Sequence, residues 1–424
     1  MGINDSDSSS SKLDLKLFQQ IFETAEPGVT IDSLEEAQGS GRGDNYTAAL
    51  YRILLKGYRT NQEGKRIKWE KSVICKRLPD SKARREAYRS EELFRNEVEF
   101  YNRILPDLLK YQQKKTNDVL RAIPHCYLAR NDLVVLEDLR VRGFEMPNRQ
   151  EGLTLDQTLA VLKELARFHS LSLSYKDQNP TEFNRLKSQV TEGIFTERNF
   201  DWYRNYYEIL TKNAIDMVSQ TLSPHSTYVE KLEKFVGNNS FFSNMVELVG
   251  RETPLATLCH GDCWTNNFLY KYDGNNDIAE TCLVDFQLIR YGSPALDVSN
   301  LIFCCTDKLL RQNNMKTFLE TYCKELVRSL RTLGPLPSFC STEEQLWTQM
   351  QSEFQIYAKF GLGLAIDILP ISTCTPEEAP DLYLVRKSGK EETNGAPELD
   401  VPPNEICRRK MTDIVIDLVD GGML

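Results

Sequence analysis

The chain has 424 residues, 41% of them hydrophobic, and a formal net charge of −9 at neutral pH. This length allows one large core or two lobes. The negative balance, without an extended basic block, argues against nucleic acid or an anionic membrane as the main partner. No apolar run approaches the ~20 residues that a membrane span needs, so no span is expected.

The N-terminal region and the cysteines favour a cytoplasmic protein. Residues 1–12 are rich in Ser and Asp, which predicts disorder, and they lack the apolar stretch of a secretory signal. The eleven cysteines form no CxxC pairs, which indicates reduced thiols and not disulfides or a zinc site. Met1-Gly2 with Ser6 fits the minimal myristoylation pattern, but the neighbouring aspartates have the wrong charge to support it, so N-myristoylation is not expected.

The first third of the sequence predicts a β-rich region. A helix is expected over 13–24, then a glycine-rich run over 38–46 and an alternating strand over 49–55. A glycine-rich turn between two strands can lay backbone N–H groups over a polyphosphate. An ordinary hairpin turn is the alternative, since no Walker A lysine follows the glycines and they do not open a helix. The candidate cradle residues are Gly39, Ser40, Gly41 and Gly43.

The next strand and helix carry a candidate ion pair. Residues 71–79 predict a strand with Lys76 near its end, and residues 90–105 predict a helix with Glu97 on an otherwise apolar face. A buried carboxylate is costly unless it is paired, and Lys76 is the natural partner. Each residue alone also fits an ordinary surface charge. In the order glycine loop, lysine strand, glutamate helix they match the Lys–Glu pair that holds nucleotide phosphates in kinases.

Beyond this point the pattern changes from strands to helices. Two further strands, 124–127 and 133–139, are expected around a turn, and the second ends where an interlobe hinge should lie. The pattern predicts an α+β protein with a β-rich lobe over 13–139 and a helical lobe over 140–424. The helices expected in the second lobe cover 155–169, 199–220, 226–249, 296–303, 306–333, 343–369 and 408–419, with a surface loop over 374–405.

The most informative pattern joins residues 258–267 to residues 283–287. Asp262 and Asn267 stand five apart on an expected short loop, and Asp285 ends an apolar run typical of a buried strand. A turn signal at Asp273-Gly274 folds the two runs into a hairpin, which brings Asn267 and Asp285 to one metal. One aspartate to orient a hydroxyl, with an asparagine and an aspartate to hold magnesium, makes a phosphoryl-transfer site. His-Gly-Asp alone fits a surface turn, but the joint pattern is far rarer.

Taken together, these segments resemble the ecdysteroid kinase-like family of insects. That family belongs to the choline kinase and aminoglycoside phosphotransferase branch of the protein-kinase-like fold. The resemblance runs from about Gly39 to the C-terminus, and its most specific parts are residues 260–267 and 284–297. The Phe-Gln…Ser-Pro-Ala-Leu-Asp string separates the family from its bacterial relatives. The other matching segments are 39–46, 73–79, 94–101, 136–139 and 165–169.

The resemblance implies a two-lobe, protein-kinase-like α+β fold and an enzyme that uses ATP and Mg2+. The reaction implied is transfer of the γ-phosphate to a hydroxyl of an ecdysteroid or a hydroxylated xenobiotic. The implied nucleotide-binding residues are Lys76 at the α- and β-phosphates, held by Glu97, and the backbone of Glu137 to Leu139 at the adenine.

The resemblance also assigns roles around the catalytic loop. It implies that Asp262 orients the substrate hydroxyl and accepts its proton, and that Asn267 and Asp285 coordinate magnesium. Asp297 is expected to brace the catalytic loop rather than to act on the substrate. His260 is expected to orient the same loop, with a role as catalytic base as the minority alternative.

Two departures from protein kinases point to a small-molecule acceptor. Gln287 stands where Asp-Phe-Gly would have its glycine, which disfavours a flip of that segment. Only 12 positions separate Asp285 from Asp297 (297 − 285), which leaves no room for the long segment on which protein kinases dock peptides.

The walls of the acceptor site stay open at the level of sequence. The aromatic stretch 195–207 and the glycine-containing stretch 360–365 are candidates, with ordinary helix packing as the alternative for each. A choline-like cationic substrate would need an aromatic cage and acidic groups, which the sequence neither shows nor excludes. A pseudokinase that binds without turnover, or a choline/ethanolamine-type kinase, is the alternative function.

Overall fold

The computed structural model describes residues 13–39, 48–79, 85–86, 89–116, 119–237, 240–375, 377–378 and 403–424. The chain forms two compact units, one from residues up to 94 together with 124–142, the other from 95–123 together with 143–424. The first contains a sheet and the second is mostly helical, which confirms the expected α+β class. The expected lobe boundary after Leu139 stays a prediction.

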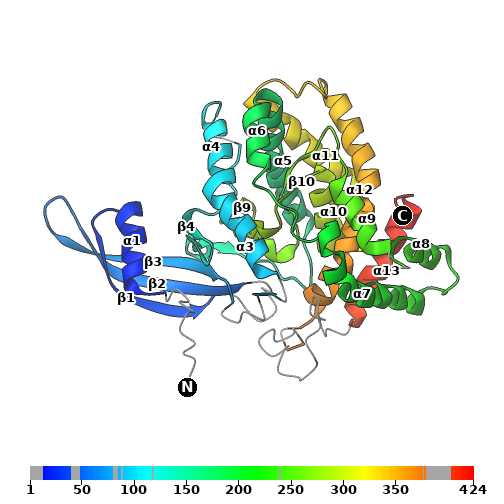
Figure 1. Cartoon of the computed structure of the whole chain (residues 1–424), viewed down its shortest axis with the longest axis horizontal. Helices are drawn as coiled ribbons and strands as arrows, with labels where there is room; N and C mark the ends of the chain where they lie inside the picture. The colour runs from blue at the N-terminus through cyan, green and yellow to red at the C-terminus, as the bar shows by residue number, and fades with distance from the viewer. Residues whose placement is uncertain are drawn as a thin grey trace, which may run out of the picture. The chain divides into compact units, whose positions relative to one another are not determined.

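The first unit is built on a five-stranded antiparallel sheet in the order β1-β2-β3-β5-β4 (Figure 1). Helix α1 packs Phe18 and Phe22 against it, where they meet Ile53 and Val73 in one apolar core. As expected, β1 and β2 form a hairpin on either side of the glycine-rich run. The elements are α1 (Leu15–Ala25), β1 (Val29–Gln38), β2 (Ala49–Thr60), β3 (Arg66–Arg77), β4 (Cys126–Arg130) and β5 (Leu133–Glu137).

The helix expected over 90–105 continues to Gln113 and contains a π-helical turn. It consists of α3 (Ser90–Glu99), a π segment (Phe100–Ile104) and α4 (Leu105–Gln113). Pro106 explains the π turn, because proline has no N–H and its ring clashes with the carbonyl four residues earlier. The Leu105 N–H accordingly donates to the Phe100 carbonyl, five residues back.

The second unit differs from the expected helices in three places. Helix α5 runs nine residues past His169, and α6 was not predicted. The helix expected over 226–249 is broken at Gly237, where a Cβ would lie 2.5 Å from the Glu233 carbonyl oxygen. The helices are α5 (Leu155–Gln178), α6 (Pro180–Lys187), α7 (Phe200–Thr221), α8 (Thr227–Val236), α9 (Ser240–Gly250), α10 (Pro294–Cys305), α11 (Lys308–Leu333), α12 (Glu343–Thr373) and α13 (Glu405–Asp420).

Helix α12 is, within the described ranges, long and apolar enough to cross a membrane by length and composition alone. However, 67% of its most apolar window is buried inside the protein, and it packs against α7, α9, α10, α11 and α13. The helix also carries Glu353 and Asp367. A buried core helix can pass the same test of length and composition, so α12 is only weak evidence for a membrane span.

Two small sheets position the predicted site. Strands β6 (Phe144–Glu145), β8 (Phe268–Tyr272) and β9 (Ile278–Leu283) form one, in the order β6-β8-β9. Strands β7 (Thr257–Cys259) and β10 (Arg290–Gly292) form the other. The antiparallel β8–β9 pair confirms the hairpin expected around Asp273-Gly274.

Candidate active site

Three predicted site residues lie at the open end of the β8–β9 hairpin. Phe268 pairs with Leu283, and the Val284 N–H donates to the Asn267 carbonyl over 3.1 Å. The Asn267 side-chain amide donates to both the backbone carbonyl and the carboxylate of Asp262, each over 2.9 Å. The fold therefore brings Asp262 and Asn267 into contact. Asp285 directly follows Val284, the residue whose N–H is bonded to Asn267.

Asp285 has a strained backbone. Its φ of 68° and ψ of 73° lie in the left-handed region, which costs a non-glycine residue roughly 1–3 kcal/mol. The short 3-10 turn Phe286–Leu288 follows at once. Such strain persists only where the surroundings impose it, and it is concentrated at functional sites. The sequence gives no signal for this conformation beyond the tolerance of aspartate for it.

The donors at this hairpin fit a magnesium ion. Mg2+ prefers oxygen ligands and is commonly bound by one or two carboxylates together with substrate phosphates. Both hydrogen bonds of the Asn267 side chain leave from its amide nitrogen, so its side-chain oxygen is available as a ligand. Asp285 supplies a carboxylate. The residue types that the sequence pattern singled out therefore match the chemistry of the ion.

His260 holds the loop that contains Asp262. Its ring is fully buried, Nε2 lies 2.9 Å from the Val284 carbonyl, and Nδ1 accepts from the Asp262 N–H over 3.2 Å. Burial lowers the pKa of His260 although Asp297 acts to raise it. A neutral ring with both nitrogens engaged orients the loop, as the sequence predicted, and has no free nitrogen to act as a base.

Asp297 braces the same loop from α10. Its carboxylate accepts from the backbone N–H groups of His260, over 2.6 Å, and Gly261, over 2.9 Å. Burial acts to raise the pKa of Asp297, but the hydrogen bond and charge of His169 and the Gly261 N–H hold it below its usual value. The expected bracing role is confirmed by these contacts.

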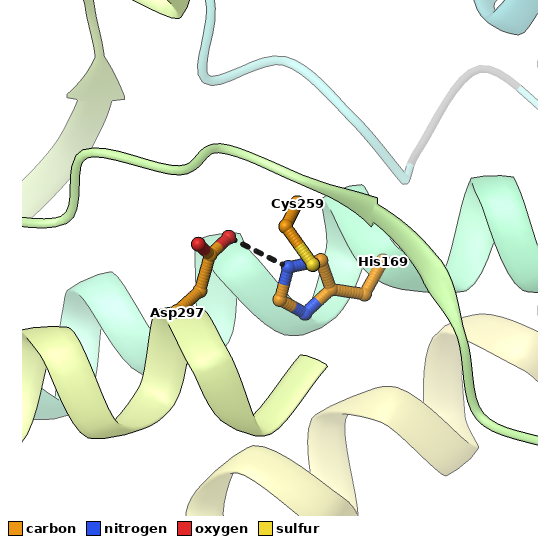
Figure 2. A group of neighbouring side chains, drawn as sticks. All are labelled: His169, Cys259 and Asp297. Atoms are coloured by element: carbon orange, nitrogen blue, oxygen red, sulfur yellow. Dashed lines mark hydrogen bonds and ion pairs between the residues drawn. The ribbon is translucent and has the colours of Figure 1, made fainter. Parts of the chain in front are cut away.

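His169 extends this brace to α11. Its Nε2 lies 3.1 Å from the Asp297 carboxylate (Figure 2), and its Nδ1 lies 2.8 Å from the hydroxyl of Tyr322 on α11. In the sequence, His169 stands out only as part of a family motif, and no pattern indicates a role for Tyr322. The contacts span 128 and 153 residues, so no local pattern could have revealed them.

The ligand atoms of His169, Cys259 and Asp297 lie within 4.8 Å of one another (Figure 2). They do not make a good metal site, because the histidine nitrogens and both Asp297 oxygens already take part in the brace. Burial raises the pKa of the Cys259 thiol, which lies 3.4 Å from the Ser293 carbonyl. The group is a hydrogen-bonded support for the loop over residues 260–262.

Gly261 is required by its surroundings. Its φ is 87°, and a Cβ built there would lie 1.8 Å from the Leu288 carbonyl oxygen. Only glycine combines the left-handed conformation with this close approach. The glycine of His-Gly-Asp thus lets residues 260–262 pass beside the segment that follows Asp285.

Aromatic packing fixes that segment. Phe286 stacks on Phe100 with ring centroids 3.8 Å apart and lies 4.5 Å from the His260 ring. The Asn96 side chain donates to the Gln287 carbonyl over 3.3 Å, and Gln287 is itself buried. These contacts, all within the second unit, agree with the expectation that the segment does not flip readily.

The predicted nucleotide residues are only partly described. Lys76 is buried on β3, and the Gly39 N–H donates to the Leu50 carbonyl over 2.9 Å. Glu137 ends β5, and Leu139 begins a 3-10 turn. Ser40, Gly41 and Gly43 lie outside the described residues. Glu97 is buried on α3 but belongs to the second unit, so the Lys76–Glu97 pair stays a prediction.

Residues 42–335, more than half of the chain, match the sequence model of the ecdysteroid kinase-like family. The chain belongs to the ecdysteroid kinase-like family. A similar protein is the 4-hydroxytryptamine kinase of Psilocybe cyanescens, 24% identical over 127 residues, which are 28% of this chain and 34% of that protein. The chain therefore spans about a third of the length of this relative.

Solved structures of small-molecule kinases also align with the chain. A Plasmodium vivax ethanolamine kinase aligns over 97% of this chain and 88% of its own, with 13% identity and a TM-score of 0.45. An ADP-bound aminoglycoside phosphotransferase aligns over 82% of this chain and 99% of its own, with 12% identity and a TM-score of 0.31.

Proposed function

We propose that this member of the ecdysteroid kinase-like family is an ATP- and Mg2+-dependent O-kinase. It transfers the γ-phosphate of ATP to a hydroxyl of a small molecule, an ecdysteroid or a hydroxylated xenobiotic. The observation that carries this proposal is the grouping of Asp262, Asn267 and a strained Asp285 at the end of one hairpin. The named activities of the kinase relatives agree with a small acceptor.

In this proposal Asp262 orients the acceptor hydroxyl and accepts its proton. The acceptor oxygen forms a bond to the γ-phosphorus while the bond from that phosphorus to the leaving oxygen of ADP breaks. Asn267 and Asp285 would hold magnesium, which when bound neutralises charge on the phosphates. Lys76, held by Glu97, would contact the α- and β-phosphates.

The rest of the nucleotide would be bound by the first unit. The glycine-rich run, with Gly39, Ser40, Gly41 and Gly43, would cover the phosphates with backbone N–H groups. A Cβ at Gly39 would approach the backbone of Leu50 and Tyr51 to 3.0 Å, which supports a need for glycine there. The adenine would meet the backbone of Glu137 to Leu139.

The brace around the loop supports the proposed chemistry. Phosphoryl transfer depends on positioning and electrostatic stabilisation far more than on covalent help from the protein. Asp297 and His260 fix the backbone on both sides of Gly261 by hydrogen bonds between buried groups. The carboxylate of Asp262 is thereby held in one place before any acceptor arrives.

The short segment after Asp285 supports a small acceptor. Between Asp285 and α10 the chain forms one 3-10 turn and the three-residue strand β10. This leaves no extended platform on which a peptide could lie. A protein substrate would need such a platform, whereas a small alcohol needs only a pocket beside Asp262.

Magnesium-dependent formation of ADP tests the proposal. Purified protein is incubated with Mg-ATP and, separately, with ecdysone, a plant phenolic glucoside, choline or 4-hydroxytryptamine. Acceptor-dependent ADP release that stops on removal of magnesium is expected with at least one compound. Nucleotide binding without any acceptor-dependent ADP would favour the pseudokinase alternative.

A further inference from the structure

An acidic and aromatic cluster lies between α7 and α12. Asp367 of α12 accepts hydrogen bonds from the Tyr206 hydroxyl at Oδ1 and from the Tyr207 hydroxyl at Oδ2, the second over 3.4 Å. Both tyrosines are buried, whereas Asp367 keeps part of its surface exposed. The rings of Tyr206 and Tyr207 lie 5.0 Å apart, and that of Tyr203 lies 5.9 Å from Tyr207. The carboxylate thus lies beside three aromatic rings, on a residue that is only half-buried.

The two sequence segments considered as acceptor walls meet in this cluster. The Phe195 ring lies 6.1 Å from Phe360 of α12 and 5.8 Å from Tyr207 of α7. Helix packing explains why these rings are in contact. It does not explain a carboxylate placed among them, because an apolar residue would fill the same position without the cost of burying a charge.

The cluster lies near the catalytic loop. The Cys304 thiol of α10 is 3.8 Å from the Gly361 carbonyl of α12. The Cys305 thiol, also on α10, lies 3.6 Å from the carbonyl of Cys263, the residue after Asp262. Helix α10 therefore contacts both the loop that carries Asp262 and α12 at Gly361, six positions before Asp367 (367 − 361).

Asp367 also lacks a cationic partner. No lysine or arginine among the described residues forms an ion pair with it, although many other carboxylates have one, Glu26, Asp138 and Asp417 among them. Arg290, whose charge acts on Tyr207, is paired with Glu192 over 2.9 Å. Burial raises the pKa of Asp367 to about 6, whereas the hydrogen bonds from the Tyr206 and Tyr207 hydroxyls act to lower it.

We propose that Asp367, with the rings of Tyr206 and Tyr207, binds a protonated amine of the acceptor. The preferred acceptor is then an apolar or aromatic molecule with an ammonium group at one end and the phosphorylated hydroxyl at the other. A carboxylate with no cation of its own, next to electron-rich rings, is suited to such a group. This inference rests on the proposed kinase function and narrows the xenobiotic class to amines.

Binding measurements with two matched probes test the proposal. The probes are 4-hydroxytryptamine and 3-ethyl-4-hydroxyindole, which keeps the ring and hydroxyl and lacks the amine. Calorimetric titration with magnesium and a non-hydrolysable ATP analogue present is expected to give at least about tenfold tighter binding of the amine, ~1.4 kcal/mol. In Asp367→Asn this preference should disappear, with the affinity for the neutral probe unchanged.

Two further variants separate recognition from structure. Asp216→Asn, which removes an exposed carboxylate ion-paired with Lys212 on α7, should retain the full preference. Tyr206→Phe keeps the ring and loses one hydroxyl, and should keep most of the preference because the carboxylate and the rings remain. Equal affinities of the two probes for the wild type, or no saturable binding of the amine, would overturn the proposal. So would an equal loss of the preference in Asp216→Asn.

Phosphate transfer, measured in parallel by mass, separates this inference from the proposed function. Transfer by the wild type that shows no preference for amine-bearing over neutral alcohols, and that Asp367→Asn does not change, would contradict the amine site and leave the kinase proposal standing. Amine-selective binding without transfer to any acceptor would support the amine site and contradict the kinase proposal. Transfer to the amine that falls in Asp367→Asn through a higher KM, with kcat little changed, would support both.

Discussion

Asp262 is presented by a loop whose geometry depends on one glycine and one buried carboxylate. Gly261 turns the chain in a left-handed conformation against the Leu288 carbonyl, and Asp297 accepts the N–H groups of His260 and Gly261. Neither residue needs to touch a substrate for its loss to matter.

Gly261→Ala should destabilise the protein strongly. The new Cβ meets a backbone oxygen at 1.8 Å in a left-handed conformation, so the loop must shift, and we expect a loss of roughly 2–4 kcal/mol in the free energy of unfolding. Urea unfolding measures this loss. Gly274→Ala is the matched control, since a Cβ there meets nothing within 4 Å. Equal stability of the two variants would contradict the assigned geometry.

Asp285→Asn should abolish magnesium-dependent turnover while the fold stays intact. The change removes a charge from the proposed metal site and alters no packing volume. Activity assays over a range of magnesium concentrations, with circular dichroism as the check of folding, measure the effect. Near-normal turnover by this variant would mean that the metal site has been assigned to the wrong residue.

Asp367→Asn should change the pH dependence of stability in a defined direction. The carboxyl has its pKa raised from 3.8 to about 6 in the folded protein, chiefly by burial. The protonated carboxyl is the form that the folded protein favours. The stability it contributes is therefore fully present below pH 4 and is lost as the pH rises through about 6. Asparagine does not ionise, so the Tm of the variant relative to wild type should rise between pH 4.5 and pH 8. A constant difference in Tm would show that this carboxyl titrates normally.

At the scale of elements, the part of the 90–113 helix that belongs to the second unit contacts the segment that follows Asp285. The π turn forced by Pro106 includes Phe100, which is fully buried and stacks on Phe286 next to Asp285. This contact connects a helix distortion to the orientation of a proposed metal ligand. It also predicts that a core substitution in this helix affects catalysis as well as stability.

Phe100→Leu should lower both stability and kcat. Losing the ring stack leaves Phe286 less well held, and we expect about 1–3 kcal/mol of destabilisation. Phe235→Leu on α8 is the control, because it makes the same change in a buried ring of another helix. Specific activity at a temperature where both variants are folded distinguishes them. Equal activity of the two would mean that Phe100 acts only in the core.

Local signals in the sequence predicted helices and strands but did not predict where a helix is broken or distorted. The β8–β9 hairpin was predicted from Asp273-Gly274 and the flanking alternation. The break of the helix expected over 226–249 was missed because periodicity continues across Gly237. The π turn was missed because Pro106 lies beyond the expected end of its helix. Apolar periodicity alone does not report such interruptions.

At the scale of the whole molecule, the residues that the sequence predicted lie close together along the chain, whereas those that it did not predict make contacts between distant segments. Asp262, Asn267 and Asp285 lie within 24 residues of one another in the sequence (285 − 262 + 1), so a motif could name them. His169, Tyr322 and Asp367 act through contacts between distant helices. The proposed phosphoryl-transfer site rests on the first group. In the second group, His169 and Tyr322 belong to the brace of the loop, and Asp367 carries the proposed choice of acceptor.

The most direct test of the account is the gain of one phosphoryl group by an acceptor, measured by mass for wild type and Asp262→Asn. The wild type is expected to phosphorylate at least one hydroxylated compound. The variant should lose kcat by a factor of ~100 or more while ATP affinity stays nearly unchanged, because the carboxylate acts on the acceptor hydroxyl. Equal turnover by the two proteins would contradict the central claim that Asp262 is the catalytic group.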